Sequence, residues 1–237
     1  MKDAKEIEYW IADTLIERPQ AFYVNDRLFY LYPVTIGKNY LLQRNIDSLE
    51  INKENMQKCP SLEILRVCKG KREIALRILV YHTFNTKKQI FDLSLVESRI
   101  RFFDKNLSDD DLAQLLVTVL SSDKTAQFTK HLGIDQENIY KSKISSLKSD
   151  TTSAISLGGK SIYGALIDFA CERYGWSYDY VIWGISYANL KLLMSDSIST
   201  HYLSKEEMKK LHIPKDRNIV SADNKENLKR MKKYFNE

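Results

Sequence analysis

Hydrophobic positions along the chain recur mainly at intervals of three and four residues, which is the period of an amphipathic helix. In residues 4–16, for example, Ile7, Trp10 and Leu15 share one face, and charged residues occupy the others. The same period predicts helices at residues 35–49, 61–69, 71–84, 87–103, 109–120, 123–131 and 136–147. Only four prolines and eight glycines interrupt the 237 residues, which also favours helices.

One early stretch departs from this pattern. Residues 21–33, AFYVNDRLFYLYP, contain two aromatic, β-prone runs on either side of Asn25 and Asp26, residue types that tolerate positive φ. We expect a β-hairpin that Pro33 closes. An isolated hairpin is marginally stable, so its apolar face must lie on a helix or its edge must pair with another chain. The predicted fold class is mainly α, a multi-helix bundle with a small N-terminal β-hairpin.

The most distinctive stretch, which we call the aromatic segment, covers residues 162–194. Its helical pattern is interrupted at Gly175, where a left-handed residue would end one helix, and Ser177 is placed to cap the next. Ser161 is the expected cap at its start. The segment is rich in aromatic residues, namely Tyr163, Phe169, Tyr174, Trp176, Tyr178, Tyr180, Trp183 and Tyr187. Such a cluster is either core or a face that receives a partner peptide, and the spacing fits both.

Composition divides the chain into four parts. Residues 1–148 form an N-terminal helical domain, 149–160 a linker rich in Ser, Thr and Gly, 161–213 the aromatic-rich helical part, and 214–237 a basic tail. The linker ends in Gly158-Gly159-Lys160-Ser161, like a phosphate-binding loop. The glycine that this motif needs five residues earlier is replaced by Ala154, so we expect no nucleotide site and no cofactor.

The net charge of +5 is mildly basic and allows weak attraction to nucleic acid. Candidate contacts fall in two groups, one in the N-terminal part and one in the tail: Lys69, Lys71, Arg72, Arg77, Lys229, Arg230, Lys232 and Lys233. A solvated face explains the first group equally well, because Glu73 interrupts it and no aromatic residues alternate with it. A nucleic-acid-associated protein therefore remains an alternative function.

Motifs for catalysis and for metal binding are missing from the sequence. The four histidines, His82, His131, His201 and His212, lack metal-site spacing, and the three cysteines form no CxxC pair. The acidic residues 109–111 follow Ser108 and mark a helix start. We expect a protein that is not an enzyme and holds no metal. The acidic N-terminus and the lack of a ~20-residue apolar run predict a cytoplasmic protein without a membrane span.

Two stretches carry a resemblance to a known family. Residues 172–193, ERYGWSYDYVIWGISYANLKLL, and residues 29–43, FYLYPVTIGKNYLLQ, resemble segments of the tail assembly chaperones and related tail accessory proteins of tailed bacteriophages. The residues that match the pattern are Tyr174, Gly175, Trp176, Ser177, Val181 and Leu190.

The resemblance implies a helical, non-enzymatic protein of the host cytoplasm that keeps a tape measure protein or another phage tail protein soluble until the tail assembles. The expected partner-binding residues are Tyr174, Trp176, Tyr178, Tyr180, Trp183 and Tyr187. The chain is longer than small members of the family, so a structural component of the virion is a further alternative.

Overall fold

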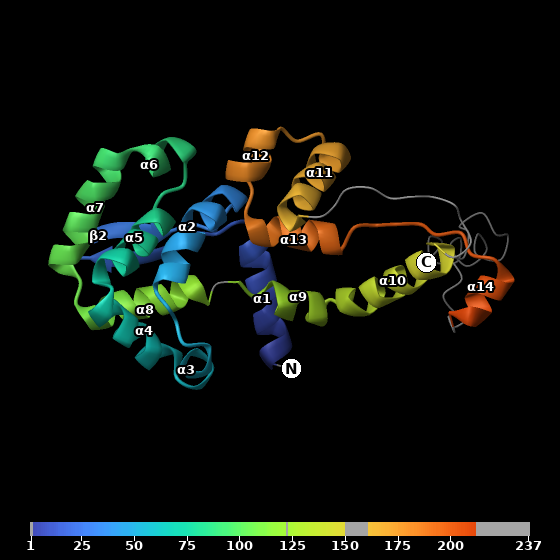
Figure 1. Ribbon diagram of the computed structural model, residues 1–237, viewed down its shortest axis with the longest axis horizontal. Coiled ribbons are helices and arrows are strands. Elements are labelled where there is room, and N and C mark those ends of the chain that lie inside the picture. Colours follow the sequence, from blue (N-terminus) through green and yellow to red (C-terminus); the bar gives the residue numbers. More distant parts are fainter. Residues whose placement is uncertain (1, 122, 150–160, 212–237) are drawn as a thin grey trace, which may run out of the picture. The chain divides into compact units, whose positions relative to one another are not determined.

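The computed structural model describes residues 2–121, 123–149 and 161–211 of the chain (Figure 1). Most of these residues are helical, and one hairpin lies near the N-terminus, as the sequence predicts. In chain order the elements are α1 Lys2–Leu15, β1 Gln20–Val24, β2 Arg27–Leu31, α2 Ile36–Ser48, α3 Lys53–Lys58, α4 Pro60–Gly70, α5 Arg72–His82, α6 Lys87–Phe91, α7 Leu93–Asn106, α8 Asp109–Leu120, α9 Thr125–His131, α10 Ile134–Ser149, α11 Ile162–Tyr174, α12 Tyr178–Trp183, α13 Tyr187–Ser195 and α14 Lys205–Lys210.

The chain forms two compact units. The first comprises residues 1–138 and 156–197, and the second comprises residues 139–155 and 198–237. In the described residues, the second unit contains most of α10 together with α14. This division differs from the predicted one, because the aromatic segment belongs to the same unit as the N-terminal helices. Residues 150–160 of the predicted linker and the whole of the predicted tail lie outside the described residues.

The hairpin confirms the expectation drawn from its sequence. β1 and β2 pair antiparallel with Phe22 opposite Phe29, and Asn25 and Asp26 both have positive φ, 44° and 58°. The inward face packs on α7, where the Phe29 ring meets the Phe103 ring edge-on at 4.9 Å between centroids. Packing on a helix therefore supplies the support that an isolated hairpin lacks.

The main hydrophobic core lies beneath this hairpin and is built largely by α4, α5, α7 and α8 of the first unit. Its fully buried side chains include Ile64, Leu76, Leu79, Phe84, Phe103, Leu112 and Leu116. In Figure 1 these four helices and the hairpin form one group, with α2 alongside. The spacing of apolar residues in each helix follows the predicted period, so each contributes one face to this core.

A second, smaller hydrophobic cluster joins the aromatic segment to the N-terminal part. Ile36 at the start of α2 is buried among Leu166 of α11, Val181 of α12 and Leu190 of α13. The backbone strengthens this junction, since the N–H of Tyr187 donates to the Val34 carbonyl at 2.7 Å. Burial of these apolar side chains explains why no domain boundary separates residues 161–197 from the first unit.

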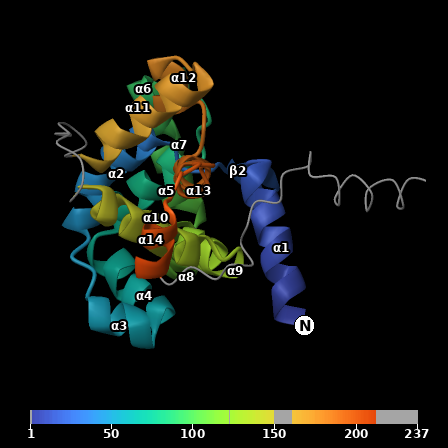
Figure 2. The ribbon, with the colours of Figure 1, turned by 90° about the vertical axis from the view of Figure 1, so that its right-hand side faces the viewer.

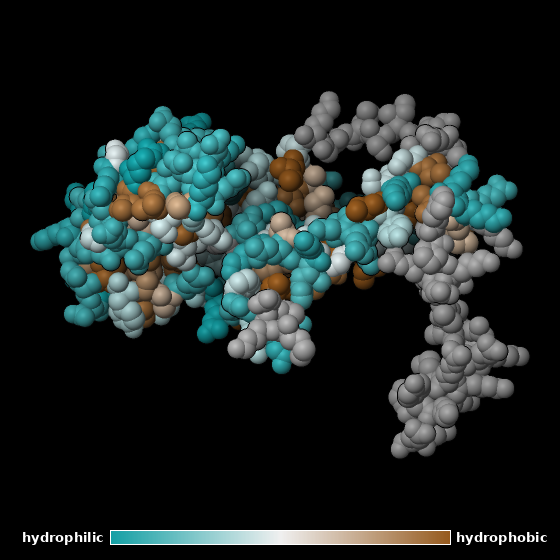
Figure 3. Space-filling model, turned by 90° about the horizontal axis from the view of Figure 1, so that it is seen from below, coloured by the Kyte–Doolittle hydropathy of each residue, from teal (hydrophilic) through white to brown (hydrophobic). Residues whose placement is uncertain are grey.

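Local signals set most of the helix ends. Thr35, Ser161 and Ser177 each cap the following helix through the side-chain oxygen, and Gly175 ends α11 with a φ of 66°. Capping boxes begin α8 at Ser108 and α14 at Ser204. The helix starts predicted at Ser108, Ser161 and Ser177 and the helix end predicted at Gly175 are confirmed. Among the described residues, no helix is both long enough and apolar enough to span a membrane. On the face shown in Figure 3, hydrophilic residues cover most of the described surface, with scattered hydrophobic patches between them.

The structure differs from the predicted helices in two places. Residues 87–103 are two helices rather than one, because Asp92 ends α6 in an extended conformation and its carboxylate accepts a hydrogen bond from the Leu95 N–H at 3.0 Å, which caps α7. The short helix α3 has no counterpart in the prediction. Its cap is Asn52, which accepts hydrogen bonds from the backbone N–H groups of Glu54 and Asn55.

Candidate functional site

Four aromatic residues form an exposed patch at the junction of α11 and α12, which we call the aromatic surface: Tyr174, Trp176, Tyr178 and Tyr180. Tyr174 stacks on Trp176 at 4.7 Å between ring centroids, and Tyr180 meets Trp176 edge-on at 5.3 Å. Tyr178 is 65% exposed. The two helices lie side by side in both ribbon views (Figures 1 and 2).

Local structure fixes these rings in place. The left-handed Gly175 turns the chain between Tyr174 and Trp176, and the Ser177 hydroxyl accepts a hydrogen bond from the Tyr180 N–H at 3.3 Å, which starts α12. Trp176 also packs against the smaller hydrophobic cluster, so one part of its ring system is anchored and the rest is open. Rings held in this way lose little conformational entropy when a partner covers them.

Two residues predicted to contact a partner lie elsewhere. Trp183 is packed between the two hydrophobic clusters, and its ring meets Phe91 of α6 edge-on at 5.5 Å. Tyr187 stacks on Tyr163 at 6.1 Å between ring centroids and lines a cavity. Both side chains therefore act in packing. The periodicity of the aromatic segment did not separate these two from the four on the aromatic surface.

The predicted basic patch on α4 and α5 is largely neutralised by ion pairs. Arg72 binds Asp104 at 2.7 Å and Asp109 at 2.5 Å. Lys71 pairs with Glu50 at 2.7 Å, and Arg77 pairs with Glu97 at 3.0 Å, whereas Lys69 is exposed. Paired side chains make weak phosphate contacts, because binding a phosphate would break existing bonds. The tail residues Lys229, Arg230, Lys232 and Lys233 lie outside the described part of the chain.

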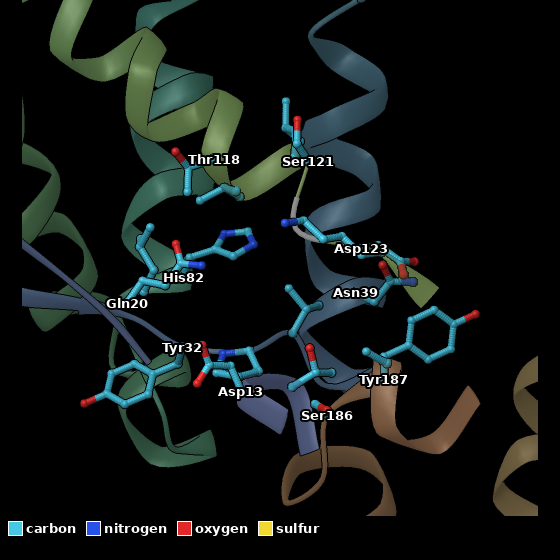
Figure 4. A pocket seen from close by; sticks show the side chains of 18 of the residues that line it. Asp13, Gln20, Tyr32, Asn39, His82, Thr118, Ser121, Asp123, Ser186 and Tyr187 are labelled. Atoms are coloured by element: carbon cyan, nitrogen blue, oxygen red, sulfur yellow. The ribbon is translucent and has the colours of Figure 1, made fainter. Parts of the chain in front are cut away.

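The first unit contains a cavity of about 590 Å³ that no sequence pattern predicted (Figure 4). Its wall combines residues from α1, the hairpin, α2, α5, α8, α9 and α13, which are far apart in the sequence. The apolar part of the lining comprises chiefly Trp10, Leu31, Pro33, Leu42, Ile46, Val119 and Phe128. Polar groups are placed among them, including Asn39, His82 and Ser121. The volume falls in the range typical of pockets for small molecules.

His82 is the most deeply buried ionisable group on the cavity wall, at 4% exposure. His82 is the last residue of α5, and its Nδ1 lies 2.8 Å from the Ile78 carbonyl oxygen. A carbonyl only accepts, so Nδ1 carries the proton and Nε2 is an acceptor. Burial, together with the positive charge of Lys38, lowers the pKa of His82 to about 4. The ring is therefore neutral at pH 7.

Lys38 lies in the first turn of α2 and is 1% exposed. Its Nζ donates to the Pro33 carbonyl at 3.4 Å and stands 5.8 Å from the centre of the Tyr32 ring. Burial lowers the pKa of Lys38 to about 8, and the carboxylate of Glu17 opposes that change. A lysine in a helical sequence pattern is expected to face solvent. The sequence therefore did not identify Lys38 as a buried residue.

The described residues contain no cluster of three or more His, Cys, Asp or Glu side chains that could hold a metal ion. Comparisons of the chain with protein-family models, with curated proteins and with solved structures found no match. The fold and the site thus define a mainly α protein with an exposed aromatic surface and a separate cavity.

Proposed function

We propose that the chain is a binding or assembly protein of the tailed-phage type that holds an amphipathic helix of a tape measure protein or another tail protein on its aromatic surface. The observation that carries the proposal is the ring cluster at the surface, in which Trp176 stacks on Tyr174 and meets Tyr180 edge-on. Trp and Tyr are the residue types most enriched at the energetic centres of protein interfaces.

The surroundings of the aromatic surface support a partner of defined chemistry. Asp168 and Glu172 are exposed and stand one turn apart on α11, the helix that ends at Tyr174 of the aromatic surface. A partner helix with an apolar face flanked by Lys or Arg would place its charges near these carboxylates. Helices of this kind bind by laying their apolar face against a hydrophobic surface.

Binding of nucleic acid receives less support, because three of the four described candidate residues, Lys71, Arg72 and Arg77, form ion pairs with acidic residues. The assembly function predicts a complex that survives moderate salt. Contacts to phosphates would instead weaken steeply as the salt concentration rises.

The test is affinity purification of the tagged full-length chain from phage-infected cells at low and moderate salt, followed by mass spectrometry. We expect a long helical tail protein that is retained at moderate salt and lost with Trp176→Ala or Tyr178→Ala. Tyr9→Ala is the matched control, because Tyr9 is 70% exposed on α1. Retention that is unchanged in both aromatic-surface variants, with the fold intact by circular dichroism, would contradict the proposal, as would recovery of nucleic acid alone.

A further inference from the structure

The cavity contains a hydrogen-bond acceptor, Nε2 of His82. The His82 ring points into the cavity in Figure 4, and its Nδ1–H is committed to the Ile78 carbonyl. In the described part of the chain, no residue forms a hydrogen bond with Nε2 of His82. Nε2 faces the space of the cavity, where an N–H or O–H group of water or of a ligand can donate to this lone pair.

The charged side chains of the cavity wall already have partners. Asp13 pairs with Arg18 at 3.2 Å, and Asp123 pairs with Lys191 of α13. The Lys124 ammonium lies over the Trp10 ring, 3.2 Å from its centre. A cationic ligand would have to compete with Arg18 or Lys191 for a carboxylate, and an anionic ligand would have to draw the Lys124 ammonium away from the Trp10 ring. An uncharged ligand avoids both costs.

The lining also indicates the shape of the ligand. Trp10, Tyr32, Phe128 and Tyr187 contribute aromatic side chains to the wall, and Leu42 and Ile46 contribute aliphatic ones. Flat aromatic molecules pack well against such a lining, with contacts to ring faces and edges.

We propose that the cavity binds an uncharged aromatic small molecule that carries one N–H or O–H group, and that this group donates a hydrogen bond to Nε2 of His82. The site is distinct from the aromatic surface and does not depend on the proposed assembly function. His82 is the specificity-determining residue, and the apolar wall provides most of the contact area.

Indole and 1-methylindole are suitable probes, because they have nearly the same shape and only indole has an N–H donor. Titrated into the full-length protein and followed by NMR, indole should shift the Nε2 resonance of His82 and the amide signals of cavity residues. We expect 1-methylindole to bind roughly fivefold to tenfold more weakly, the factor that one buried hydrogen bond to a neutral group contributes.

Two variants locate the binding. His82→Phe keeps an aromatic ring and removes the acceptor, so it should bind the two probes with equal affinity. Ala188→Trp fills the cavity from α13, where Ala188 lines the wall, and should abolish binding of both. This second variant tests the site even if His82→Phe does not fold.

The control is Leu62→Ala, on α4 and 66% exposed, which should leave both affinities unchanged. Three results would overturn the proposal: no binding of indole up to its solubility limit, equal affinity of the wild-type chain for both probes, or unchanged binding by a folded Ala188→Trp variant.

Discussion

Trp183 of α12 covers Gly37 of α2 so closely that a Cβ atom at position 37 would stand 2.6 Å from Cζ3 of the indole ring. Real Cβ atoms do not approach other atoms to this distance, so only glycine fits at position 37 without a shift of the ring. The same ring contacts both hydrophobic clusters. This contact therefore ties the aromatic segment to the main core.

Gly37→Ala should destabilise the protein by about 1 to 3 kcal/mol, because the ring must move out of a packed position. The gain in helix propensity of up to about 1 kcal/mol offsets only part of that cost. Urea unfolding measures the difference. Gly70→Ala is the control, since a Cβ there would have no neighbour within 4 Å, and we expect it to cause no loss. A Gly37→Ala variant as stable as the wild type would contradict the close contact.

Trp183→Ala and Trp176→Ala should differ in their effect on stability. Trp183 lies between two clusters, so its removal should lower the free energy of unfolding by about 3 kcal/mol. Trp176 stacks on the exposed Tyr174 and packs against only one cluster, and its removal should cost clearly less. Chemical denaturation of both variants checks this order. Equal losses would show that Trp176 is as much a core residue as Trp183.

The hairpin turn stores strain at Asp26, whose φ is 58°. Asp26→Gly should raise the free energy of unfolding by roughly 0.5 kcal/mol, because glycine adopts positive φ without a steric cost. Asp26→Val should have the opposite effect, since a β-branched residue is strongly disfavoured there. Thermal unfolding of the pair distinguishes the signs. Asn25 is left unchanged, as its side-chain amide donates to the Asn106 side-chain oxygen at 2.6 Å.

Acid stability should depend on Glu63. Hydrogen bonds from Arg66, from the Asn52 N–H and from the Asn55 amide lower the pKa of Glu63 from 4.5 to about 2. Glu63 thus binds a proton less tightly in the folded state than in the unfolded state. The stabilisation that its carboxylate contributes is fully present above pH 4.5 and is lost as the pH falls towards 2. The difference in unfolding free energy between wild type and Glu63→Gln should shrink over that range. A constant difference would contradict the lowered pKa.

His82 should give a second pH dependence at higher pH. Its pKa is about 4 in the folded protein, against an ordinary value of 6.5, so the unfolded state takes up the proton first as the pH falls. Stability should therefore decrease between pH 6.5 and 4, and His82→Phe should flatten the wild-type profile in that interval. Equilibrium unfolding at a series of pH values tests this, and an unchanged slope in the variant would count against it.

Sequence patterns determined the local structure of this protein to a large extent. The apolar period placed most helices, and the Asn25-Asp26 turn, the serine caps and Gly175 set the ends of elements, because such signals act within a few residues. The break at Asp92 escaped prediction, since Asp is compatible with both a helix interior and a cap. The prediction missed helix α3, because this helix has only six residues and none of them is buried.

Tertiary structure alone decided which aromatic residues are exposed and which are packed. Trp176 and Trp183 both belong to the aromatic segment, yet Trp176 lies on the aromatic surface and Trp183 packs against Gly37. The cavity and the buried His82 and Lys38 likewise depend on residues from distant elements. Contacts across long sequence separations are set by how helices pack, and the period of one helix shows which face is apolar but not what covers it.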